Sequence, residues 1–244
     1  MMDIVIENRY GLDDVIKKTI EYISKEIHKS FNTDNDTKWM ISRKNEEVKK
    51  HLLEIDAVSR KRTVLKLLLS EQIYSLIEMM ECINAGIIKG TNLLMRNIYE
   101  CMIHIETFIN YAHANTIFKN WVEGKIDWRW RHRNELKFLR KVRNYETSMK
   151  IEKETYRTLS DFAHPTIYSN IKTLSKDRSL GVYKVDKNWL CQSVMMVVDG
   201  CKFVYNFCGE KEDVISKLNH LSNIILKLMA EHYYRDKQMK DKSK

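Results

Sequence analysis

Residues 64–88 are VLKLLLSEQIYSLIEMMECINAGII, a run dense in Leu, Ile and Met. Such density over this length is typical of a helix that is buried on most of its surface. Ala85-Gly86 and the following Gly90 are the first signals that would end it. We therefore expect a central helix over Val64–Ile88.

Helical signals continue on both sides of this run. Gly11–His28 carries apolar residues at helical spacing, and the polar cluster Asn32–Asp36 then predicts a turn. Gly124–Trp130 is expected to be a connection, and Leu174–Asp186 an ordered loop rather than a small hairpin. The other expected helices are Trp39–Arg62, Asn92–Ala114, Ile117–Val122, Arg131–Asn144, Glu152–His164, Asn188–Cys208 and Asp213–Arg235.

The whole chain has few residues that stop helices. It contains one proline and seven glycines in 244 residues, so helices can run long. No repeat or change of composition marks a linker. We expect an all-α protein, a single bundle of long antiparallel helices over 1–244, with N-terminal helices in 1–62, a central part in 63–172 and a C-terminal pair in 187–236.

The cysteines and the apolar runs bear on location. The five cysteines have no close CxxC pair and mostly fall in apolar helical runs, which favours buried, reduced thiols. No stretch approaches the roughly 20 apolar residues of a membrane span, and the N-terminus does not resemble a signal peptide. We expect a cytoplasmic protein without a membrane partner.

Net charge is +9, which makes an acidic partner such as nucleic acid worth testing. Lys125–Arg143 holds eight Lys or Arg against two acids and is interleaved with Trp128, Trp130 and Phe138. Such a segment can bind phosphates and stack bases, although a solvated helix face would have the same composition. The candidate nucleic-acid surface is Arg129, Arg131, Arg133, Lys137 and Arg140.

Arg96, Glu100 and His104 recur every four residues in the helix expected from Asn92. This spacing places them on one stripe, with Asn97 beside it. The opposite face is apolar, so the stripe is either part of a pocket or the wet side of an ordinary amphipathic helix.

A second polar group precedes the only proline, Pro165. Arg157, Ser160, Asp161 and His164 share one face of the helix expected to end there. A histidine in the last turn is favoured in its protonated form, and an arginine can bind phosphate oxygens bidentately. The group suits phosphoryl chemistry, whereas the structural alternative is a capping histidine with Arg157 paired to Asp161.

The run YRTLSDFAHP, residues 156–165, resembles the signature segment of the HEPN superfamily, in which an arginine precedes a histidine near a helix end. LMRNIYE, residues 94–100, resembles the Arg-x-x-x-Glu helix of uncharacterised bacterial proteins related to that group. The similarity spans 67–171, within the central part 63–172.

The resemblance implies a metal-independent endoribonuclease of a toxin–antitoxin or phage-defence system, with RNA as substrate, a homodimer, an antitoxin or defence partner, and no cofactor or metal. His164 would be the acid/base and Arg157 the group that stabilises the phosphate. Arg96, Asn97, Glu100, His104, Ser160 and Asp161 would shape the same pocket.

Other classes lack their motifs. The chain has no Glu-x-x-His pairs for a dimetal bundle, and no Walker loop, GxGxxG, GxSxG or HExxH. Two non-catalytic interpretations stay open: an interaction module that binds a protein or nucleic acid, and a buried polar network that only specifies the bundle.

Overall fold

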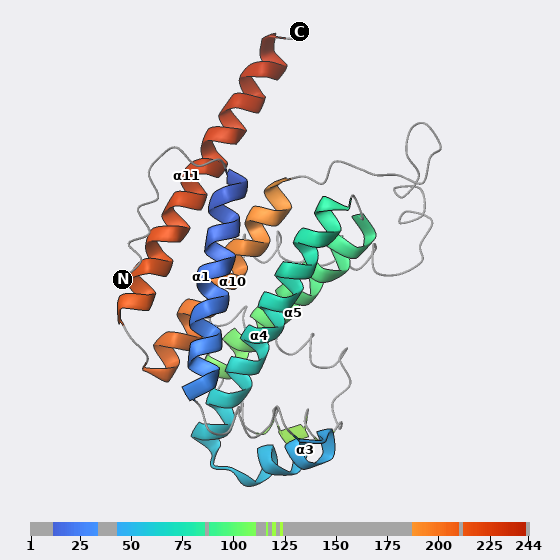
Figure 1. The fold of residues 1–244 in the computed structure, drawn as a ribbon, viewed down its shortest axis with the longest axis vertical. Coiled ribbons are helices and arrows are strands. Elements are labelled where there is room, and N and C mark those ends of the chain that lie inside the picture. Colours follow the sequence, from blue (N-terminus) through green and yellow to red (C-terminus); the bar gives the residue numbers. More distant parts are fainter. Residues whose placement is uncertain are drawn as a thin grey trace.

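The computed structural model describes residues 12–33, 43–85, 88–110, 116, 119–120, 123, 187–209 and 212–242. In these ranges every regular element is an α-helix, and the helices pack into one bundle (Figure 1). They are α1 (Leu12–Thr33), α3 (Asn45–Glu54), α4 (Ala57–Asn84), α5 (Ile88–Asn110), α10 (Lys187–Cys208) and α11 (Glu212–Lys242). The predicted all-α bundle is confirmed.

An antiparallel pair, α4 and α5, forms the centre of the bundle. Lys61 Nζ of α4 donates to the carbonyl oxygen of Ile109 at 3.1 Å, and Gln72 Nε2 donates to that of Ile98 at 2.9 Å. Residue numbers therefore rise along α4 as they fall along α5, which fixes the register of the pair.

Helix α10, which precedes α11 in the sequence, lies against both members of this pair and also contacts α11 and α1. Lys202 of α10 connects the two helices, because its Nζ donates to Ser222 Oγ of α11 at 2.8 Å. The same Nζ lies 3.2 Å from Oδ1 of Asp199, which is also on α10. Gly209, with φ of 68°, turns the chain between the two helices. The last turns of α11 extend beyond the other helices (Figure 1).

The core is one apolar cluster with contributions from every helix of the described part. It explains why the apolar runs became helices: each presents a stripe of Leu, Ile, Val or Met to the centre. Its most buried large side chains include Ile16, Leu65, Leu69, Leu76, Met79, Met95, Ile98, Ile105 and Leu218.

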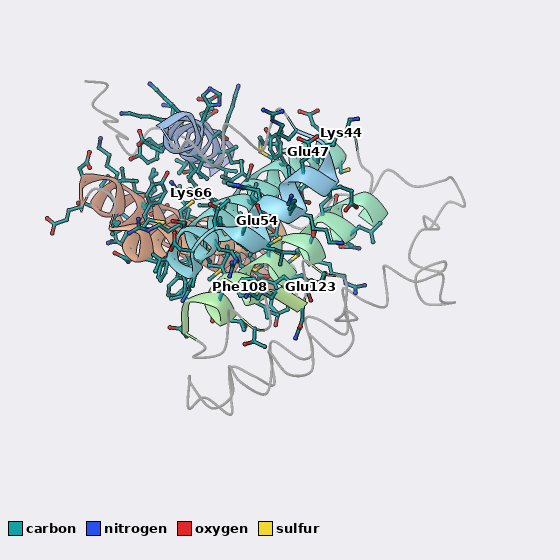
Figure 2. The ribbon with its side chains drawn as sticks, turned by 90° about the horizontal axis from the view of Figure 1, so that it is seen from below. Lys44, Glu47, Glu54, Lys66, Phe108 and Glu123 are labelled. Atoms are coloured by element: carbon teal, nitrogen blue, oxygen red, sulfur yellow. The ribbon has the colours of Figure 1, made fainter. Side chains whose placement is uncertain are left out.

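The chain bends sharply between α3 and α4. Asp56 is the N-cap of α4, and its carboxylate accepts hydrogen bonds from the backbone N–H groups of Val58 and Ser59 at 2.9 and 3.0 Å. A hydrogen bond from the hydroxyl of Ser59, together with these backbone bonds, lowers the pKa of Asp56. Figure 2 shows α3 across the end of the bundle, with Glu47 and Glu54 labelled on it and Lys44 labelled just before its first residue.

Arg60 completes this corner. Its guanidinium is buried and donates to the carbonyl oxygens of Leu52, Leu53 and Ile55, which α3 leaves without helical partners where it ends. The prediction of one helix over Trp39–Arg62 was wrong, because Asp56 and Arg60 stabilise a break that apolar periodicity does not reveal.

Two other predicted boundaries were wrong in detail. Gly90 lies inside α5, and the central helix begins at Ala57 rather than Val64. The expected helices Asn188–Cys208 and Asp213–Arg235 agree with the starts of α10 and α11 to one residue. Arg131–Asn144, Glu152–His164 and the loop Leu174–Asp186 lie outside the described residues.

Candidate functional site on α5

Four of the predicted site residues belong to α5, and two of them form an ion pair. Arg96 Nε donates to Glu100 Oε1 at 2.9 Å, as the spacing of four residues indicates. The side chains are 15% and 30% exposed, so the pair is half-buried rather than solvated. Pairing of this kind orients the guanidinium and largely neutralises its charge.

Asn97 joins the stripe to α4. Its Nδ2 donates to Glu71 Oε1 at 2.7 Å and to Ser75 Oγ at 2.8 Å. These bonds hold α4 and α5 in register, so the structural role of Asn97 is clear. Spacing within α5 cannot show it, since both partners come from another helix.

His104 is buried, with 9% of its surface exposed. Its ring lies against Phe108, with centroids 6.3 Å apart and planes inclined by 31°. The interpretation of the stripe as the solvent-exposed side of an amphipathic helix is therefore wrong at His104. His104 sits inside the bundle, where an apolar neighbour limits its contact with water.

The polar side of α5 is buried as well as its apolar side. At about 100° per residue, Asn92, Tyr99 and Ile103 lie on the side away from core residues such as Ile98, Cys101 and Ile105. They are 1%, 7% and 4% exposed. Helix α5 is thus enclosed on two sides, one apolar and one rich in polar groups.

Two buried polar atoms on this second side have no hydrogen-bond partner within the described part of the chain: Asn92 Nδ2 and Thr107 Oγ1. A buried group left in this state typically costs about 1–3 kcal/mol. The two residues lie roughly 22 Å apart along the helix axis. They do not belong to one small-molecule site.

Level with the C-terminal half of α5, α4 contributes two cations that spacing within α5 does not reveal: Lys66, which is buried, and Lys61, which is half-buried. Lys66 is 9% exposed, and the register places it level with His104. Figure 2 labels Lys66 and Phe108. The available signal was a lysine within the apolar run VLKLLL, residues 64–69, because a charged residue at such a position is rarely buried without a partner.

Lys61 is the second of these cations. Its ammonium lies 4.5 Å from the centre of the Phe207 ring and caps the end of α5 through the Ile109 carbonyl. Burial lowers the pKa of Lys61. The amine joins α4, α5 and α10 at one point.

The second predicted constellation lies outside the described residues, so its relation to α5 stays a prediction. This applies to Arg157, Ser160, Asp161 and His164, and also to the candidate surface of Arg129, Arg131, Arg133, Lys137 and Arg140. The structure brings together only the α5 members: Arg96 with Glu100, and Asn97 with α4.

All five cysteines lie within the described ranges, where none of them is in a disulfide, and Cys82 and Cys208 are only partly buried. Cys101, Cys191 and Cys201 are buried, and burial raises the pKa of Cys201. A thiol of this kind is protonated and unreactive at neutral pH. Across the described ranges, no group of three or more His, Cys, Asp or Glu side chains is placed to hold a metal ion.

None of the helices in the described ranges combines the length and apolar character needed to cross a membrane. No protein-family model, curated protein or solved structure matches the chain. The resemblance to the HEPN superfamily therefore stays a prediction.

Proposed function

We propose that the protein is a HEPN-like, metal-independent endoribonuclease of a toxin or phage-defence system. The observation that carries this proposal is the run from Arg157 to His164-Pro165, whose arginine and terminal histidine suit attack on a phosphodiester. The half-buried Arg96–Glu100 pair supports it, since an oriented charged pair on a central helix is a common element of a polar pocket.

In the proposed reaction the ribose 2′-oxygen attacks the adjacent phosphorus. His164 takes the proton of the 2′-hydroxyl, and the bond from phosphorus to the 5′-oxygen breaks. Protonation of that oxygen leaves one product with a 5′-hydroxyl and the other with a 2′,3′-cyclic phosphate. Arg157 stabilises the charge that develops on the phosphoryl oxygens.

The remaining site residues have supporting roles in this proposal. Arg96, Asn97, Glu100 and His104 of α5 would shape the same pocket as Ser160 and Asp161. The basic segment Lys125–Arg143 binds the RNA backbone. The enzyme would act as a homodimer, held inactive by an antitoxin or engaged by a defence partner.

The test is cleavage of a mixed RNA pool in EDTA. We expect wild type to release products with cyclic-phosphate ends, and His164→Ala to lose at least about a hundredfold in rate, the usual size of an acid/base contribution. His28→Ala is the matched control, because His28 is an exposed histidine on α1. Helicity and melting temperature must match across the three proteins. Equal cleavage by His164→Ala would refute the assignment.

The alternative is a non-catalytic interaction module. It is favoured by Asn97, whose bonds to Glu71 and Ser75 hold α5 to α4 without any need for substrate, and by the Arg96–Glu100 pair, whose bond is satisfied within α5. Under this alternative, His164→Ala would lower the melting temperature or weaken a partner complex, and wild type would cleave no RNA.

A further inference from the structure

The second half of α4 presents an exposed ridge to solvent. Its residues follow one line along the helix: Leu67, Glu71, Tyr74, Ile77, Glu78 and Glu81. Tyr74 is 64% exposed, and Leu67 and Ile77 are each 38% exposed. The three glutamates are exposed as well. On α5, Leu93 is 42% exposed one turn before Asn97, which bonds to Glu71.

Charge on α4 is ordered against the helix dipole. Residues 57–70 contain four cations and no acid, whereas residues 71–84 contain three acids and no cation. A helix is stabilised by acids near its N-terminus and by cations near its C-terminus. The glutamates of the α4 ridge are therefore not placed to stabilise their own helix.

Of these carboxylates, Glu71 accepts a hydrogen bond from Asn97. Within the described part of the chain, Glu78 and Glu81 make no ion pair, and they repel each other at a spacing of three residues. The charge of this acidic face is opposite in sign to the net charge of the protein, which is +9. A surface of this kind selects a partner by charge.

We propose that the α4 ridge docks a cationic amphipathic helix of another protein. Such a helix would set Leu or Ile against Tyr74 and Ile77, while flanking Lys or Arg side chains meet Glu78 and Glu81. The ridge from Leu67 to Glu81 spans about four turns, or roughly 21 Å, which suits a helix of similar length. This inference is independent of the proposed ribonuclease activity.

The same charges disfavour two other occupants. Carboxylates repel the phosphates of nucleic acid. A second copy of this chain, related by a two-fold axis along the α4 ridge, would bring glutamates against glutamates. Cationic protein segments are the complementary class.

The experiment uses the full-length protein and two fluorescent peptides. The first is an 18-residue amphipathic helix with a leucine seam flanked by lysines, and the second has glutamate at every lysine position. Anisotropy titrations are run at low and moderate salt. We expect wild type to bind the lysine peptide at least about tenfold more tightly than the glutamate peptide, with a preference that weakens as salt rises.

Glu78→Lys/Glu81→Lys should reverse this preference. Glu21→Lys/Glu46→Lys changes net charge equally at exposed positions on α1 and α3 and should leave it within about twofold. Tyr74→Ser, which keeps the charge, should weaken binding of the lysine peptide. Since cations suit the second half of a helix, the reversed variant should melt no lower than wild type, so its loss of binding would not reflect unfolding.

Three results would overturn the proposal. The first is binding of both peptides alike by wild type, or a preference unchanged by Glu78→Lys/Glu81→Lys. The second is a wild-type dimer in sedimentation that the reversal dissolves, which would make a second copy the occupant. The third is that wild type binds neither peptide and that only Glu78→Lys/Glu81→Lys has a lower melting temperature. This result would make the chain's own basic segment, Lys125–Arg143, the occupant of the ridge.

Discussion

Arg60 is a single side chain that completes a corner of the bundle. Its buried guanidinium satisfies three carbonyl oxygens at the end of α3. We expect Arg60→Ala to lower the free energy of unfolding by about 2–4 kcal/mol, because it leaves buried acceptors unpaired and opens a cavity. Arg60→Lys should lose less, since an ammonium keeps the charge but cannot span all three oxygens. Urea unfolding measures both.

Arg62→Ala is the control for this prediction. Arg62 lies two residues away on the same helix and is exposed, so its loss should change stability by no more than about 0.5 kcal/mol. Equal losses for Arg60→Ala and Arg62→Ala would contradict the proposed role of Arg60.

Lys61 should make stability depend on alkaline pH. Its pKa is lower in the folded protein than in the unfolded chain because burial disfavours the ammonium. Folding therefore releases a proton between these two pKa values, and wild type gains stability relative to Lys61→Met as pH rises through that window toward about 10.4. Denaturation curves of wild type and Lys61→Met from pH 7.5 to 10.5 would show the difference, and a stability difference that does not change with pH would contradict the prediction.

At the scale of elements, α4 and α10 approach closely at Gly200. A Cβ on this residue would lie 2.5 Å from Gln72 Oε1, and Gln72 is fully buried with its amide nitrogen bonded to Ile98. We expect Gly200→Ala to destabilise the protein by about 1–3 kcal/mol through overpacking. In a Gln72→Ala background the same change should instead stabilise by up to about 1 kcal/mol, since alanine is the better helix former. Thermal unfolding of wild type, the two single variants and the double variant gives the coupling free energy between Gly200 and Gln72. Additive effects of the two changes would rule out the contact.

Elements differ in how well the sequence predicts them. The starts of α10 and α11 follow from apolar periodicity and clear polar boundaries. The break at Asp56 does not follow from periodicity, because the helical pattern of the sequence continues through it. The hydrogen bonds of Asp56 and Arg60 stabilise the break. The Arg96–Glu100 pair was predictable from its spacing. Burial of His104 and the α4 partners of Asn97 were not, since both depend on tertiary packing.

At the scale of the molecule, the described part of the chain is organised around one antiparallel pair, with helices from the N-terminal and C-terminal parts of the chain packed on it. Periodicity predicts that apolar stripes meet in a core, which is why the all-α bundle was predictable. It cannot show that α5 is enclosed on its polar side too, because a polar stripe has the same pattern whether water or protein covers it. Arg96 and Glu100 of the candidate site lie toward that side, and their predicted role depends on tests of activity.

The order of the helices along the chain also affects the protein while it is being made. Helices α4 and α5 are near neighbours in sequence and can pair as soon as both leave the ribosome, but α10 begins only at residue 187. At roughly 5–20 residues per second, translation of the intervening segment takes about 4–15 s. During that interval an α4–α5 hairpin would have no α10 to cover its inner face, which includes Gln72. We therefore expect the nascent chain to be most prone to aggregation before α10 emerges.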